Sequence, residues 1–148
     1  MKKLLLSLFA VFACFMLSAC GATKLNETVE IKEDNIKFTV LGSETVTIPD
    51  DGISVLHGDF VKVNVKVENT GTETYKWNAL NFSLDDKTIA LLALGQQDFL
   101  VEEVAAGETV TGYLYFEKTD AKVLTYFSHF EAASTDTAKT VKYEFNIK

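Results

Sequence analysis

Hydrophobic and polar residues alternate with a period of two along most of the chain after residue 27. The clearest run alternates four valines with four polar residues between Val61 and Glu68. Such alternation is typical of an antiparallel strand that buries one face and exposes the other. The pattern therefore predicts that four side chains face a core: Val61, Val63, Val65 and Val67.

Similar alternation marks further short strands at residues 28–32, 36–40, 45–48, 80–84, 110–117 and 141–147. Turn residues separate them, as in Pro49–Gly52 and Asn69–Thr72. Two other segments are apolar on both faces. Ile89–Leu94 fits a buried strand or a short helix, and Val123–Phe130 fits a central or covered strand. Seven or eight short strands without a helical period predict an all-β antiparallel sandwich, with a closed barrel as the alternative.

The first 19 residues have the layout of a secretory signal peptide rather than of a structural element. Lys2 and Lys3 form a positive start, and the apolar run from Leu4 to Leu17 follows. This run has 14 residues, whereas a membrane-spanning helix needs about 20. We therefore expect residues 1–19 to be removed; a short uncleaved anchor is the alternative.

The residues at the expected cleavage point carry more information. Leu17-Ser18-Ala19-Cys20 resembles the lipobox of bacterial lipoprotein precursors. The resemblance implies cleavage before Cys20, a diacylglyceryl group on its thiol, and anchoring to the outer face of the cytoplasmic membrane. Two acyl chains suffice for stable anchoring. Cys14 leaves with the signal, so lipidation would consume the only thiol of an exported chain.

The chain after residue 19 is expected to consist of a tether and one domain, and its charge limits its partners. Residues 20–34 are expected to form the lipidated cysteine and a tether, in which the alternation at 28–32 can begin a first strand. Residues 35–148 are expected to form the sandwich domain. Without residues 1–19 the chain has 12 lysines, no arginine and 21 acidic residues, a net charge of −9. Such a chain repels polyanions, so nucleic acid is excluded as a partner.

Two segments resemble the signatures of a known family. Asp59–Gly71 is similar to a valine strand followed by an Asn-x-Gly turn, and Ala105–Phe116 is similar to a second conserved strand. The family is an immunoglobulin-like domain of unknown function in lipoproteins of Gram-positive bacteria, related in fold to a secreted mycobacterial immunoprotective antigen. Ala106 stands where the family usually has proline. The resemblance covers roughly residues 35–148, implies an immunoglobulin-like sandwich, and carries over no catalytic residues.

The chain offers little catalytic or metal-binding chemistry. His57 and His129 are its only histidines, and a zinc site typically needs three or four nitrogen or sulfur ligands. Asp50–Gly52 and Asp85–Asp86 lack the spacing of a calcium loop and fit turns. There is no nucleophile elbow and no glycine-rich phosphate loop. We therefore expect no enzyme activity, no bound metal and no cofactor.

The best candidates for an interaction surface are aromatic. Tyr113 and Tyr115 share the face of their strand opposite to Leu114 and Phe116, and Phe60 has the polar parity of the valine strand. Exposed tyrosines often anchor binding faces. Cover by another part of the chain is the alternative, with Ile89–Gly95 or the strand of Tyr126 as possible covers.

These observations predict a lipid-anchored lipoprotein with a non-catalytic binding or structural domain. Its partners would be the membrane, through the lipid on Cys20, and an unidentified protein or cell-wall component. Two rival functions remain open at this point. One is a small surface hydrolase or metal-dependent enzyme, and the other is a subunit or inhibitor that captures a protein by strand addition.

Overall fold

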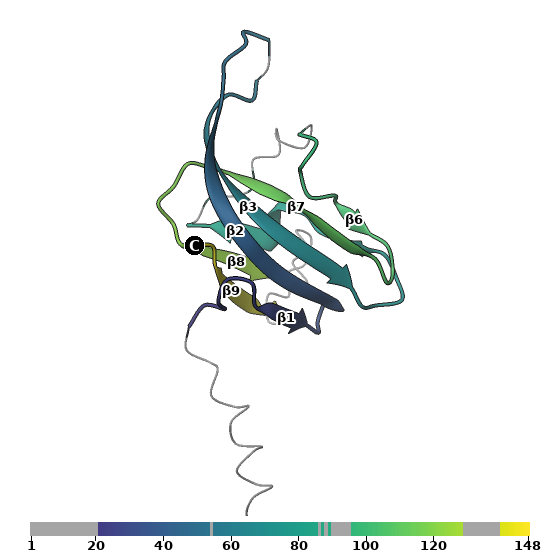
Figure 1. The fold of residues 1–148 in the computed structure, drawn as a ribbon. Coiled ribbons are helices and arrows are strands. Elements are labelled where there is room, and N and C mark those ends of the chain that lie inside the picture. Colours follow the sequence, from purple (N-terminus) through teal and green to yellow (C-terminus); the bar gives the residue numbers. More distant parts are fainter. Residues whose placement is uncertain (1–20, 54, 86, 88, 90–95, 129–139) are drawn as a thin grey trace, which may run out of the picture.

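The computed structural model describes residues 21–53, 55–85, 87, 89, 96–128 and 140–148, and almost all of their regular structure is β-strand (Figure 1). A four-stranded antiparallel sheet has the order β1-β2-β3-β7, a three-stranded sheet has the order β5-β8-β9, and β4 pairs with β6. The elements are β1 (Thr28–Ile31), β2 (Ile36–Ile48), β3 (Gly58–Asn69), β4 (Tyr75–Lys76), the 3-10 helix η2 (Ala79–Asn81), β5 (Phe82–Leu84), β6 (Glu103–Val104), β7 (Thr109–Glu117), β8 (Val123–Phe127) and β9 (Lys142–Asn146). The strands form separate sheets rather than one closed barrel, so the predicted antiparallel sandwich is confirmed.

The alternation in β3 is confirmed residue by residue. Val61, Val63, Val65 and Val67 are at most 3% exposed, and the polar residues between them are half-buried on the other face. Val65 lies between Val40 of β2 and Gly112 of β7 in the sheet register. The β3 valines thus form the centre of one wall of the core.

A bulge in β2 joins two segments that the sequence shows as separate strands. Val40 pairs with Val65 and Gly42 pairs with Asn64, which leaves Leu41 without an opposite residue. One extra residue moves all following side chains to the other face of the sheet. Val46 and Ile48 therefore lie on the outer face, although they continue the parity of the buried Phe38 and Val40.

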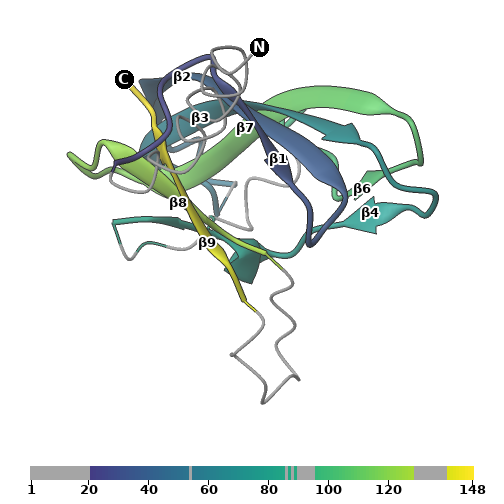
Figure 2. The same ribbon diagram turned by 90° about the horizontal axis from the view of Figure 1, so that it is seen from below.

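The two larger sheets pack face to face around an aromatic core (Figure 2). Phe38 of β2 contacts three rings of the second sheet, those of Phe82, Tyr126 and Phe145, at centroid distances of 5.0–5.8 Å. β8 is central in that sheet, as its apolar sequence predicts. Trp77 is buried and its ring packs edge-on against Phe82. Burial of such a large side chain stabilises the core.

The N-terminal segment is part of the fold, which corrects the expected tether over residues 20–34. Thr23 forms a parallel bridge to Phe145, with hydrogen bonds on both sides of that residue. Residues 28–31 form β1 and pair with β2. The backbone groups of these residues find partners along exposed sheet edges, so the folded part begins near Thr23.

Asn69 brings the two sequence signatures together. Its side chain is buried, donates to the carbonyl oxygens of Glu73 and Val104, and accepts from the Gly71 amide. Its backbone pairs with the turn at Gly107 and Glu108, through bonds of 2.9 and 3.0 Å. The Asn-x-Gly turn therefore positions the start of β7.

All described strands and the hydrophobic core lie between residues 21 and 148. This part of the chain has its own core and can fold without the first twenty residues. Within the described residues, no helix is long and apolar enough to cross a membrane. Residues 1–20, most of Ile89–Leu94, His129 and Phe130 lie outside the described residues.

Candidate functional site

The three aromatic candidates lie on the outer face of the four-stranded sheet, as their parity predicts, but two of them are not exposed. Tyr115 is 3% and Phe60 is 7% exposed, whereas Tyr113 is half-buried. The expectation that Tyr115 and Phe60 form an open aromatic surface is therefore wrong. Phe60 belongs to the core cluster, and Tyr115 is covered from the side of β7.

The cover of Tyr115 comes from Asp98–Leu100, which lies along the outer edge of β7. These three residues are called the crossing segment below. The Tyr113 amide donates to the Asp98 carbonyl, and the Leu100 amide donates to the Tyr113 carbonyl, at 2.8 and 3.0 Å. Phe99 lies between them and stacks on the Tyr115 ring with an interplanar angle of 10°. The Phe99 ring also stacks on Trp77, at a centroid distance of 6.0 Å.

Gly112 allows this close crossing. A Cβ atom at residue 112 would lie 2.6 Å from the Leu100 Cα and 2.8 Å from the Leu100 nitrogen. Both are backbone atoms that no side-chain rotation can move. The glycine at this position of the second signature therefore lets Asp98–Leu100 lie along β7.

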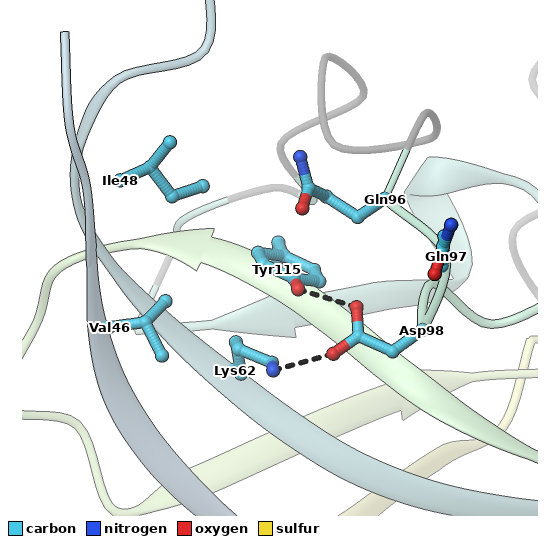
Figure 3. A pocket seen from close by; sticks show the side chains of 7 residues that line it. All are labelled: Val46, Ile48, Lys62, Gln96, Gln97, Asp98 and Tyr115. Carbon is cyan, nitrogen blue, oxygen red and sulfur yellow. Dashed lines mark hydrogen bonds and ion pairs between the residues drawn. The ribbon is translucent and has the colours of Figure 1, made fainter.

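A polar network forms where the crossing segment meets the sheet (Figure 3). Asp98 accepts from the Lys62 ammonium and from the Tyr115 hydroxyl, each at 2.6 Å. The Lys62 ammonium also lies 3.4 Å from the Glu44 carboxylate and 4.0 Å from the centroid of the Tyr113 ring. One lysine thus joins β2, β3, β7 and the crossing segment.

This network forms one wall of an open hollow of about 450 Å³ on the outer face. Val46 and Ile48 of β2 face it from one side, and Gln96 and Gln97 face it from the other (Figure 3). The bulge in β2 places the two apolar side chains there. The hollow therefore combines an apolar side with an amide-bearing side.

The charges of the network are fixed at neutral pH. Burial favours the neutral form of Lys62, but its hydrogen bond to Asp98 and the nearby charges outweigh burial and raise the pKa of the Lys62 ammonium. Burial also opposes ionisation of Asp98, yet the donors Lys62 and Tyr115 hold the pKa of its carboxyl below the usual value. Burial and the bond to Asp98 raise the pKa of Tyr115 to about 12.

The network has little capacity for proton transfer. Lys62 and Tyr115 stay protonated near pH 7, and each oxygen of Asp98 already accepts a hydrogen bond. A general base must be free to accept a proton from a substrate. Asp98 is therefore not free to act as a general base in this cluster.

Replacing Asp98 by Asn tests the network. We expect a loss of roughly 0.5–1 kcal/mol of unfolding free energy at pH 7, because the pair is partly solvent-screened. The wild-type contribution is present above the unfolded pKa of about 3.9 and is lost as the pH falls through the lower folded pKa. Urea unfolding of both proteins should therefore give stabilities that converge in acid. A difference that stays constant down to about pH 2 would contradict the assignment.

The remaining sequence candidates are dispersed. His57 is exposed in the β2–β3 connection. The described residues contain no group of three or more His, Cys, Asp or Glu side chains placed to hold a metal ion. Sequence reasoning missed Lys62 and Asp98 as partners. Parity places Lys62 beside Tyr115, but no local signal places Asp98 there.

The comparisons with known proteins identify the family. A family model described as "Domain of unknown function (DUF4352)" matches residues 23–138. The chain belongs to this family. No match is found among curated proteins. The expected membership in a β-sandwich family of unknown function is thus confirmed.

Three solved structures are similar in fold to this DUF4352 chain. The yjhA protein from Bacillus subtilis has a TM-score of 0.60 and 19% identity, over 85% of this chain and 99% of that one. A functionally unknown protein from Listeria monocytogenes has a TM-score of 0.55 and 12% identity, over 86% and 85%. MPT63, a secreted protein from Mycobacterium tuberculosis, has a TM-score of 0.53 and 14% identity, over 86% and 99%. At these identities the likeness shows the fold alone.

Proposed function

We infer that this protein is a lipoprotein anchored to the outer face of the cytoplasmic membrane, whose DUF4352 domain binds a partner without catalysis. The observation that carries the proposal is the motif Leu17-Ser18-Ala19-Cys20 after a charged start and an apolar run. Lipidation of Cys20 would place the domain outside the cytoplasm. The secreted MPT63 shares the fold and supports an extracytoplasmic place.

The start of the fold supports this arrangement. Thr23 is already bonded to β9 through Glu144 and Asn146. Three residues of extended chain reach at most about 11 Å. A lipid on Cys20 would therefore hold the domain close to the membrane surface, and binding would use the faces and edges that point away from the anchor.

The side-chain network supports binding rather than catalysis. The best-formed polar cluster on the outer face joins Lys62, Asp98 and Tyr115, and all three are engaged with one another. An enzyme of acyl or phosphoryl transfer needs a free nucleophile or base in a converging pocket. The cluster serves instead to fix the shape of the outer face.

Replacing Cys20 by Ala tests the anchor. In a bacterial host that processes lipoproteins, the wild type should partition with membranes and incorporate labelled fatty acid. The variant should lose the label completely, because an alanine side chain has no thiol to alkylate. Ser18→Ala, which keeps a small residue in the motif, is the matched control and should keep the label. A Cys20→Ala variant that still carries the label would contradict the proposal.

A further inference from the structure

Within the described residues, the outer edge of β2 is unpaired over its second half. β1 pairs with β2 only as far as Thr39, and the last backbone bond along this edge joins the Asn26 amide to the Val40 carbonyl. From Gly42 to Ile48, no other strand of the described residues lies along that edge. Figure 1 shows this part of β2 rising with β3 beyond the rest of the sandwich. Ser43 Oγ donates to the Ile147 carbonyl at 2.8 Å, so the C-terminal segment contacts β2 at this residue. Beyond Ser43 the edge presents backbone donors and acceptors to an extended chain.

The sequence of this edge favours pairing. Thr45, Val46, Thr47 and Ile48 are all β-branched, and Glu44 carries the only charge between Gly42 and Ile48. Natural proteins commonly protect free edges with lysine, proline or an inward-pointing charge. Here the first proline is Pro49, after the strand ends. The residues of this edge therefore favour pairing with a further strand.

A notch opens directly on this edge. It has a volume of about 220 Å³ and is lined by Gly42, Ser43, Glu44, Asn64 and Tyr113. Gly42 has no side chain to close it, and nothing lies within 4 Å of where a Cβ would be. Asn64 stands opposite Gly42 in the register, so its amide forms the floor.

The floor of the notch carries an unused acceptor. Asn64 Oδ1 is buried and accepts no hydrogen bond from the described residues. A buried acceptor without a donor lowers stability. A side chain that enters the notch with an N–H donor would remove this cost.

The charge around the notch selects a basic donor. Lys62 is nearby, but Asp98 holds its ammonium at 2.6 Å and Glu44 lies 3.4 Å from it. Together the three side chains carry a net charge of −1. Pairing of this edge with the same edge of a second copy is unfavourable, because the residues from Phe38 to Val61 contain no lysine or arginine and four acidic residues.

We propose that the Gly42–Ile48 edge of β2 binds an extended strand of a partner protein, and that a lysine or arginine of this strand enters the notch to bond Asn64 Oδ1 and Glu44. The added strand would pair with the backbone of β2, and the basic side chain would set its register. This inference rests on the binding role proposed above, but not on the lipid anchor. It assigns that role a surface and a partner chemistry.

The test uses residues 21–148 and end-capped nine-residue peptides in which threonine and valine alternate around one central residue. The central residue is lysine, norleucine or glutamate. Amide chemical shifts in the domain should change along Gly42–Ile48 on titration with the lysine peptide. We expect that peptide to bind about tenfold more tightly than the norleucine peptide, with the glutamate peptide weakest.

Asn64→Val removes the acceptor and keeps a strand-forming residue. In this variant the affinity for the lysine peptide should exceed that for the norleucine peptide by about threefold or less. Both peptides should still pair with the backbone of β2. Thr111→Val is the matched control. Thr111 lies on the same face of the sheet, but in β7, which pairs with β3 on the side away from β2. This variant should keep the full preference for lysine.

Three results would overturn the proposal. They are shift changes outside the β2 edge, equal affinity for the three peptides, and a concentration-dependent dimer that Val46→Lys abolishes and that excludes the peptide. The last result would make a second copy the occupant. Fatty-acid labelling of Cys20 is independent of all three, so failure at this edge leaves the anchor to its own test.

Discussion

Replacing Val65 by Asp should cost about 4 kcal/mol or more of unfolding free energy, close to the full stability of a small domain. Val65 is 0% exposed at the centre of β3, between β2 and β7. An aspartate there would place an unpaired charge among apolar side chains, and no lysine is among the buried residues that the structure describes. Urea unfolding followed by circular dichroism measures the loss, and a largely unfolded variant is the expected extreme.

Lys66→Asp is the matched control for this change. Lys66 is the next residue of the same strand, lies on the outer face and is half-buried. The same aspartate should cost under about 1 kcal/mol there. Equal losses for the two variants would mean that the register of β3 is wrong.

Gly112→Ala should cost about 2–3 kcal/mol and should also uncover Tyr115. The added methyl group would meet the Leu100 backbone at 2.6 Å, so the crossing segment would have to move away from β7. This movement breaks the two backbone bonds of Tyr113 and separates Asp98 from Tyr115. The pKa of Tyr115 should then fall from about 12 toward the ordinary tyrosine value.

Unfolding experiments and an absorbance titration of the tyrosines measure the two effects of Gly112→Ala. Thr111→Ala, one residue earlier in β7 and exposed on the outer face, is the control and should change neither quantity markedly. A Gly112→Ala variant with wild-type stability and an unchanged tyrosine titration would show that the crossing segment does not depend on this glycine.

The sheet could be predicted from the sequence wherever strands follow strict alternation. β3 is the clearest example, because each of its valines is buried as its parity requires. β2 departs from strict alternation. Its bulge at Leu41 shifts the alternation by one residue, so that one strand of 13 residues gives the pattern of two short strands. Local periodicity contains no signal that distinguishes a bulge from a turn.

The candidate site was harder to predict, because parity gives the face of a side chain and not its cover. Tyr115 lies on the predicted face, yet Phe99 and Asp98 reach it from a segment that follows an apolar run with no clear period. The position of that segment depends on Gly112, 12 residues further along the chain than Leu100. Such long-range contacts leave no mark on local sequence. Cys20 lies outside the described residues, and its lipidation stays a prediction.

Mass spectrometry of the N-terminal peptide tests the lipid anchor on Cys20. The protein is purified from the membrane fraction of a lipoprotein-processing bacterium and cleaved at its lysines. We predict a first peptide that begins at Cys20, ends at Lys24 and carries a diacylglyceryl group on the thiol. A first peptide that retains residues before Cys20, or one that begins at Cys20 without a lipid, would contradict it.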